Sequence, residues 1–286
     1  MRKRKSVFPD VEEIESAAPW FFSVADEIFI TALKEQNKRP DFIKKYPAHL
    51  VLNHGKNVFS NAVALSFLGN KPEEFLLEKA AISSYAGPIH DLFKGEVDAD
   101  GNDIHAAVAA RFAEDVMFGL KVSDRVKKGV VSVIRGHEDY IPVFEKVPSE
   151  EYIFFLADLL DRACEDRIFI VLYNVLKEGK AETVEEFMRK KWFIYHKEEE
   201  SIYRPCKEDR RPAILKAYDN DVRRIIKMYK EMMRDDRIKE EVEVRGKRLV
   251  EINLAVSQIN SRRFYEEKIT ELRDVIRRQA LVDYLM

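Results

Sequence analysis

Apolar residues recur along most of the chain at the three- and four-residue spacing of an amphipathic α-helix. After His54, for example, Val58, Ala62 and Leu65 follow at four, eight and eleven positions, which places them on one helical face. Glycine and proline in residues 69–72 then end this pattern, as they commonly do at helix C-termini. No segment shows a clear alternation of apolar and polar residues typical of a half-buried strand. The sequence therefore predicts an all-α protein, with helices over residues 11–38, 54–68, 73–86, 104–117, 123–134 and 149–162; Pro19 makes the first of these one helix or two.

The character of the chain changes after Gly179, where charged and amphipathic segments replace the apolar ones. Residues 213–286 contain no proline and one glycine, Gly246, and are expected to form two or three long surface helices. The 3-4-3 spacing of apolar residues in residues 249–259 ends at Arg263, which disfavours a long coiled coil. We therefore predict three regions. They are an N-terminal helical segment at 1–48, a helical core at 49–178, and a C-terminal helical accessory region at 179–286 that covers or gates the site or pairs subunits into a homo-oligomer.

Composition narrows the class of protein. The 286 residues are 46% hydrophobic, enough for a packed core, and 35% charged with a net charge of -2, which disfavours nucleic acid as a partner. Cys164 and Cys206 are too few for a disulfide framework and fit a reducing cytoplasm. The basic N-terminus is not followed by the apolar run of a secretory signal. The most apolar window, residues 168–176, is far shorter than the roughly 20 residues of a spanning helix, so we expect a cytoplasmic protein without a membrane span.

Histidine and aspartate recur at or near the ends of the predicted helices. One of them, Asp158, lies among leucines and needs a partner if it is buried. A single histidine near an apolar stripe is more often a packing residue than a ligand, so a metal site would need several of these residues together. Imidazole and carboxylate together suit iron, manganese, zinc or nickel. The candidate ligands fall within 105 residues and are His54, His90, Asp91, His105, His137 and Asp158.

The order of these residues resembles that of the HD-domain superfamily of metal-dependent phosphohydrolases, particularly its members that hold two metals. His54 and the apolar positions after it are similar to the first motif of that family, and Asp91 to Lys94 resembles its HD-x-x-K motif. His105, which precedes a run of small residues, resembles the third motif. Ala157-Asp158 followed by Asp161-Arg162 is similar to the closing A-D-x-x-D motif. The resemblance covers residues 49–178 and does not extend over the C-terminal third.

The chain also departs from the pattern of that family. Leu92 and Phe93 replace the usual small pair between the aspartate and the lysine, which is expected to crowd or reshape the pocket. No Gly-Tyr-Pro follows His137, so cyclic-di-GMP phosphodiesterases of the HD-GYP type are not supported. The Glu-Asp motif of guanosine-tetraphosphate hydrolases is absent after Lys94. The resemblance therefore leaves the substrate open.

The resemblance implies a site with two divalent cations roughly 3.5 to 4 Å apart. Asp91 would bridge the cations and take part in catalysis. One cation would be held by His54, His90 and Asp158, and the other by His105 and His137. Lys94 and Arg162 would bind the phosphate of a small phosphorylated substrate such as a nucleotide, the arginine through its bidentate fork. If residues 89–94 are helical, His90 and Lys94 share one face.

Other residues with metal-binding or catalytic chemistry are interpreted as structural. His49 lies five positions before His54 and off its helical face, and His196 lies in a run of lysine and glutamate. Asp139 is expected in a turn or as a residue that orients an imidazole. Asp161 is expected on a solvated face, where it positions Arg162.

Other classes of function share the same residues. Mixed-valent di-iron oxygenases within the superfamily have a similar set of histidines and aspartates. A non-enzymatic module, in which the metal only stabilises the fold and the helical tail recruits a partner, is another alternative. Nucleases of the CRISPR-associated HD type are disfavoured as processive enzymes by the near-neutral charge and by the lack of a helicase motif.

Overall fold

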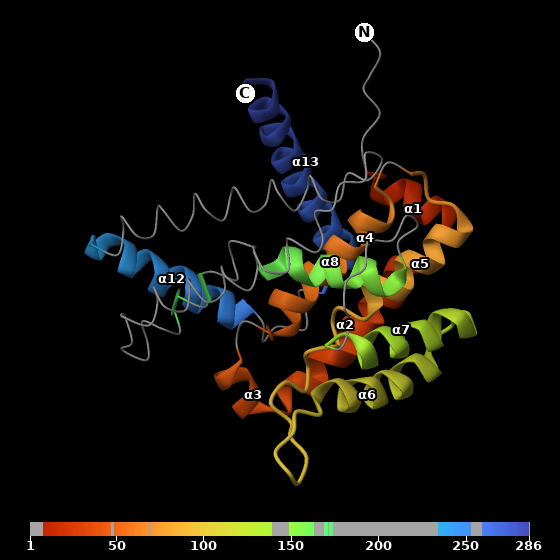
Figure 1. The fold of residues 1–286 in the computed structure, drawn as a ribbon, viewed down its shortest axis with the longest axis horizontal. Helices are drawn as coiled ribbons and strands as arrows, with labels where there is room; N and C mark the ends of the chain where they lie inside the picture. Colours follow the sequence, from red (N-terminus) through yellow and green to blue (C-terminus); the bar gives the residue numbers. More distant parts are fainter. Residues whose placement is uncertain are drawn as a thin grey trace.

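The computed structural model describes residues 8–46, 49–68, 70–138, 149–162, 169–170, 172–173, 234–252 and 259–285. Within these ranges the regular secondary structure is helical (Figure 1). The described residues contain no strand; one isolated bridge joins Val97 and Asp103 in the loop before residue 105. The all-α prediction is confirmed.

The helices predicted before residue 163 lie close to their expected positions. The first segment divides at Pro19 into α1 (Val11–Ala17) and α2 (Phe21–Asn37). The next helices are α4 (Lys56–Ser66), α5 (Glu74–Tyr85), α6 (His105–Gly119), α7 (Asp124–Gly136) and α8 (Glu150–Arg162). Between α2 and α4 lie two short elements that the pattern did not separate, α3 (Pro40–Lys45) and the π-helical turn η2 (Val51–Gly55). The described C-terminal helices are α12 (Asp236–Ile252) and α13 (Ser261–Leu285).

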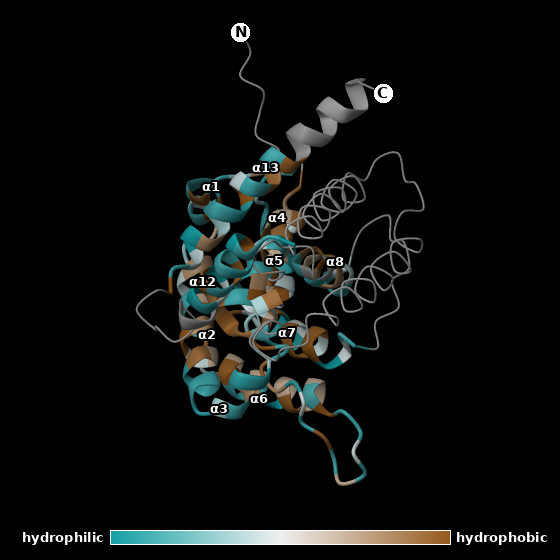
Figure 2. Cartoon of the chain, turned by 90° about the vertical axis from the view of Figure 1, so that its left-hand side faces the viewer, coloured by the Kyte–Doolittle hydropathy of each residue, from teal (hydrophilic) through white to brown (hydrophobic). Residues whose placement is uncertain are grey.

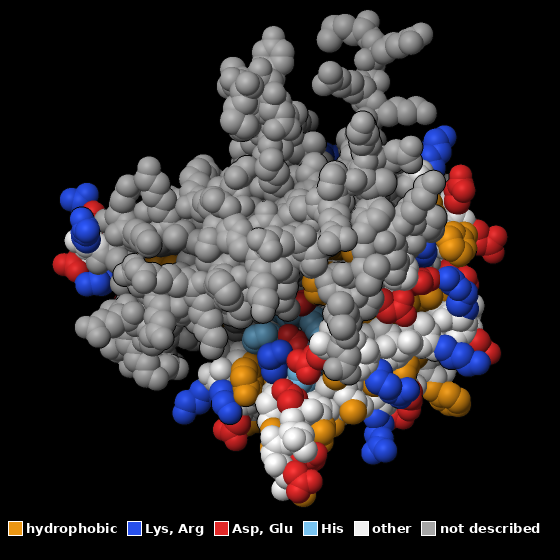
Figure 3. Space-filling view, in the orientation of Figure 1, with side chains coloured by type: hydrophobic (Ala, Val, Ile, Leu, Met, Phe, Trp, Pro, Cys, Tyr) orange, Lys and Arg blue, Asp and Glu red, His pale blue; other side chains and the backbone are white. Residues whose placement is uncertain are grey.

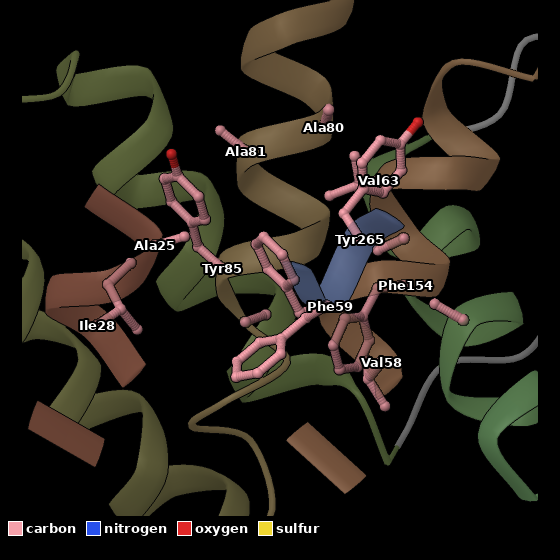
Figure 4. Packing of buried hydrophobic residues seen from close by; sticks show 14 of the residues in the cluster. Ala25, Ile28, Val58, Phe59, Val63, Ala80, Ala81, Tyr85, Phe154 and Tyr265 are labelled. Atoms are coloured by element: carbon pink, nitrogen blue, oxygen red, sulfur yellow. The ribbon is translucent and has the colours of Figure 1, made fainter. Parts of the chain in front are cut away.

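Helix α4 lies at the centre of the fold. It packs against α5, α8 and α13, and all its residues from Asn57 to Ser66 are buried. Figure 4 shows side chains of α4 among Tyr85 of α5, Phe154 of α8 and Tyr265 of α13. Helix α6 packs against α7, and α7 packs in turn against α5 (Figure 1). The segments before and after α4 are therefore anchored by a packed core on several sides.

Helix α13 belongs to this core, so the expectation of surface helices throughout residues 213–286 is wrong for this element. Tyr265 and Leu272 are fully buried. The Tyr265 hydroxyl donates to the carbonyl oxygen of Pro9 at 3.0 Å, and the Ser261 hydroxyl donates to the carbonyl oxygen of Phe22 at 3.0 Å. The sequence did not reveal this burial because long charged residues alternate with the apolar ones along α13.

Hydrophobic residues lie mainly between the helices, with hydrophilic residues along their outer sides (Figure 2). Among the described helices, none combines the length and the apolar character that crossing a membrane requires.

Candidate metal centre

The predicted ligands come from five places in the chain. His54 lies in η2, whose π-helical geometry is frequent at functional sites. His90 and Asp91 lie in consecutive turns after α5, and His105 is the first residue of α6. His137 follows the last residue of α7, and Asp158 lies within α8. The fold therefore brings together side chains from segments that are far apart in the sequence.

Two glycines allow the segments that carry His54 and His90 to touch. A Cβ atom on Gly55 would lie 2.9 Å from the Cα of Pro88, and one on Gly87 would lie 2.8 Å from the backbone nitrogen of Phe59. Neither contact can be relieved by moving a side chain, because the neighbouring atoms are backbone. This approach places the Nε2 atoms of His54 and His90 only 2.9 Å apart.

Each of the four predicted histidines has its Nδ1 atom engaged by an acceptor. Carbonyl and ionised carboxylate oxygens only accept hydrogen bonds, so Nδ1 is the donor in each case. In a neutral ring the lone pair is then on Nε2, the atom that would bind a cation. The Nδ1 partners are Asp161 Oδ2 for His54 at 2.6 Å, Gly87 O for His90 at 2.9 Å, Asp103 Oδ1 for His105 at 2.7 Å and Ile134 O for His137 at 2.7 Å.

Four groups of potential ligands are present among the described residues. Two of them bring in residues outside the predicted set, namely His49 with His54 and Asp91, and Asp103 and Glu138 with His105. The other two consist of predicted ligands alone. One group consists of His54, His90 and Asp158, and the other of Asp91, His105 and His137; within each, the ligand atoms lie within 4.8 Å of one another. In the first group, Asp158 Oδ1 lies 3.3 Å from His54 Nε2. In the second, Asp91 Oδ1 lies 3.4 Å from His105 Nε2.

These spacings fit ligands that share a cation. Two atoms about 2.1 Å from one ion lie about 2.9 Å apart at a right angle and about 3.4 Å apart at a tetrahedral angle. Burial lowers the pKa of His90 to about 3. The charge of Asp91 opposes this shift, whereas the charges of His54 and His137 lower the pKa further. The ring of His90 is therefore neutral near pH 7. The Nε2 atoms of His54 and His90 lie 2.9 Å apart, and because both Nδ1 atoms donate elsewhere, this short contact requires either a shared proton or a cation between the two Nε2 atoms. His105 Nε2 is also buried and has no hydrogen-bond partner among the described residues. The buried His/Asp groups could therefore hold a metal ion.

Asp91 lies between the two groups and presents one oxygen to each. Its Oδ2 atom is 3.2 Å from His54 Nε2, whereas its Oδ1 atom is 3.4 Å from His105 Nε2 and 3.8 Å from His137 Nε2. Burial by itself would raise the pKa of Asp91, but the surrounding imidazoles, with those of His90 and His49 contributing most, hold the pKa well below its usual value. The carboxylate is therefore ionised and can bind through both oxygens.

Two residues that were expected apart from the ligands lie beside them, and for Asp161 the expectation of a solvated face is wrong. His49 Nδ1 lies 2.6 Å from Asp91 Oδ2. His49 precedes η2, so it does not lie on the same helix as His54 and a shared helical face does not apply to it. Asp161 is fully buried rather than solvated, and it accepts hydrogen bonds from His54 at 2.6 Å and from Asn57 Nδ2 at 2.7 Å.

Residues 87–95 form turns, not the helix on which His90 and Lys94 were expected to share a face. Lys94 Nζ instead lies 3.2 Å from Asp91 Oδ1, and the Lys94 side chain is 29% exposed to solvent. Phe93 packs against Phe112, and the guanidinium of Arg39 lies 4.6 Å from its ring centroid. The bulky pair at residues 92–93 is thus accommodated by packing contacts.

Two acidic residues that sequence reasoning did not assign to the site also lie beside it. Glu138 Oε1 is 3.3 Å from His105 Nε2, and Asp103 holds the other nitrogen of the same ring. The adjacency of Glu138 to His137 in the sequence was the available signal. Arg162 ends α8, but its side chain lies outside the described part of the structure, as do Asp139 and His196.

The centre reaches the molecular surface. The side chains of His49 and Asp158 are 17% and 16% exposed to solvent. Figure 3 shows histidine side chains at the surface, in one patch with acidic and basic side chains. No family model matches this chain, and the searches of curated proteins and of solved structures found no match to it either.

Proposed function

We propose that this protein is a metal-dependent phosphohydrolase of the HD-domain type that uses two divalent cations. The observation that carries the proposal is the placement of Asp91, whose two oxygens each face a separate group of histidines. One carboxylate that binds through both oxygens is the simplest ligand for two neighbouring cations.

The proposed division of ligands follows these groups. His54, His90 and Asp158 would hold one cation, and His105 and His137 the other, with Asp91 shared. Support comes from two independent sources, the order of these residues along the chain and their convergence in space. Two cations in such a site supply a hydroxide-like nucleophile near neutral pH and offset the charge on the attacked phosphate.

The residues around the groups would bind and orient the substrate. Lys94 carries a partly exposed ammonium next to Asp91, where it can meet a phosphate oxygen as a point charge. Arg162 is proposed as a second phosphate ligand on the strength of the sequence motif. The described centre also contains the carboxylates of Asp91, Asp158 and Asp161, so cations are required before a phosphorylated substrate such as a nucleotide can bind without strong repulsion.

Elemental analysis combined with a panel of nucleotide and other phosphate substrates tests this function. We expect about two ions per chain and phosphate release with manganese under anaerobic conditions. Asp158→Asn should lose at least one ion and nearly all turnover, whereas Asp115→Asn, at an exposed position on α6, should lose neither.

Other outcomes would favour the alternatives. One ion per chain, with His105 and His137 replaceable without loss, would contradict the two-cation proposal. Turnover that requires iron and oxygen would identify a di-iron oxygenase. Loss of folding on chelation, without any turnover by the loaded protein, would indicate a structural metal.

A further inference from the structure

The imidazole of His49 contacts the carboxylate proposed to bridge the cations. Its Nδ1 atom lies 2.6 Å from Asp91 Oδ2. The residue belongs to the connector between α3 and η2, and its backbone N–H donates to the carbonyl oxygen of Tyr46 at 2.9 Å. Its ring also packs edge-on against the rings of His54 and Tyr46, with centroids 5.4 Å and 6.3 Å away. Backbone and ring contacts therefore both fix the position of the His49 imidazole.

A bridging carboxylate works only if its plane is held in one orientation. Each carboxylate oxygen has two lone-pair directions, so it can accept one hydrogen bond and still bind a cation. In this structure Lys94 contacts Oδ1 of Asp91 at 3.2 Å, and His49 contacts Oδ2. Without the contact at Oδ2, rotation about the Cβ–Cγ bond of Asp91 would turn its oxygens away from the two histidine groups.

We propose that His49 is a positioning residue that donates its Nδ1 hydrogen to Asp91 Oδ2 and so fixes the orientation of the bridging carboxylate. This inference rests on the proposed metal centre and names a residue that acts on it. The distance supports a hydrogen bond over direct ligation. Charge-assisted N–H···O bonds are about 2.7–2.9 Å long, whereas two ligands of one cation lie about 2.9 Å apart or more. The observed 2.6 Å lies on the hydrogen-bond side of this division.

Two substitutions at this position separate positioning from ligation. In His49→Asn the side-chain amide can place a donor near the position of Nδ1, but it provides no imidazole. In His49→Leu the donor is lost and a similar volume is kept. Metal affinity is measured by competition with a chelator, and cobalt(II) loaded into the protein reports the number of nitrogen ligands through its absorption spectrum.

We expect His49→Leu to bind metal about 10–100-fold more weakly, as is typical when a residue that orients a ligand is removed. His49→Asn should recover most of that loss, and its cobalt spectrum should match that of the wild-type protein. Lys44→Gln, at an exposed position in α3, serves as the control and should bind as the wild type does. Melting of the metal-free variants checks folding, and His49→Ala replaces the leucine variant if the latter does not fold.

Three results would overturn the inference. Equal loss in the asparagine and leucine variants, with a cobalt spectrum that has lost one imidazole, would make His49 a direct ligand. Wild-type affinity in both variants would leave His49 without a role in metal binding. A wild-type protein that binds no cation would overturn the proposed function and this inference together, whereas the first two results leave the proposed function standing.

Discussion

Replacing Asp161 should weaken metal binding even though this residue is outside the proposed ligand set. Asp161 is fully buried and accepts two hydrogen bonds, one from His54 Nδ1 at 2.6 Å and one from Asn57 Nδ2 at 2.7 Å. The first of these bonds fixes the ring of His54 and makes its Nε2 atom a better donor to a cation. The sequence suggested only a modest role for Asp161 through Arg162, and the structure replaces that expectation.

The size of the effect follows from what each substitution leaves behind. In Asp161→Asn the amide oxygen can still accept from His54, and the side chain of Asn57 can turn its own oxygen toward the new amide group. What is lost is the charge, and a charge-assisted hydrogen bond is about twice as strong as a neutral one. We therefore expect metal affinity to fall about 10–100-fold, or about 1.4–2.7 kcal/mol. Asp161→Leu instead removes the acceptor of two buried hydrogen bonds, at about 1–3 kcal/mol each, and should also destabilise the metal-free protein.

Chelator competition and denaturant unfolding of the metal-free protein measure the two effects separately. Asp158→Asn is the reference for loss of a ligand and should bind at least one ion fewer. Asp161→Asn should keep the ion count and lose affinity. The reasoning is refuted if Asp161→Asn binds metal as tightly as the wild type, or if it binds none while Asp158→Asn is fully loaded.

Three further predictions follow from the packing and electrostatics. Gly87→Ala should lower the free energy of unfolding by about 1–3 kcal/mol and weaken metal binding, because the new Cβ would meet the backbone of Phe59. Gly119→Ala is the control, because a Cβ there would have nothing within 4 Å. Equal effects of the two substitutions in chemical denaturation would contradict the close backbone approach at Gly87. The free energy of unfolding of the metal-free protein should fall as the pH drops from about 6.5 toward 3. The pKa of His90 is lowered in the folded protein, so over this range the unfolded chain binds a proton at His90 that the folded protein does not. His90 should therefore contribute a decrease of at most about 1.4 kcal/mol per pH unit. Unfolding curves that are flat over this range would show that His90 does not make this contribution. Deleting residues 261–285 should abolish cooperative melting, because the deletion removes buried side chains such as Tyr265. Burial of each such side chain stabilises the fold by roughly 1.5–3 kcal/mol. A truncated chain that melts cooperatively and binds metal would contradict the placement of α13.

The sequence predicted the features that depend on local patterns. The three- and four-residue spacing identified helices α1, α2 and α4 to α8, because helical periodicity is written in consecutive residues; the short helix α3 was not identified. The six candidate ligands were found by their order along the chain, and the structure brings them together in two groups. The predicted division between His54 with Asp158 and His105 with His137 matches those groups.

Residues that act through the fold could not be found in this way. His49 reaches Asp91 because the connector before η2 folds back, and no periodic pattern describes a connector. Asp161 was assigned to solvent from its charged neighbours, whereas the contact between α4 and α8 buries it. Gly55 and Gly87 are separated by 32 positions in the sequence, and only the folded chain shows that their backbones meet.

The packing around α4 also bears on where the functional unit ends. A metal site requires ligand positions held to within about 0.5 Å, and the spacing between His54 and His90 depends on α4 being held rigidly. Helix α13 packs against both α2 and α4, and the backbone N–H of Ser261 donates to Asp26 Oδ1 at 2.8 Å. Asn53, the neighbour of His54 in η2, donates to the carbonyl oxygen of Leu249 in α12 at 3.4 Å. Because elements from both ends of the chain touch the scaffold of the site, the geometry of the proposed centre should depend on residues far outside 49–178.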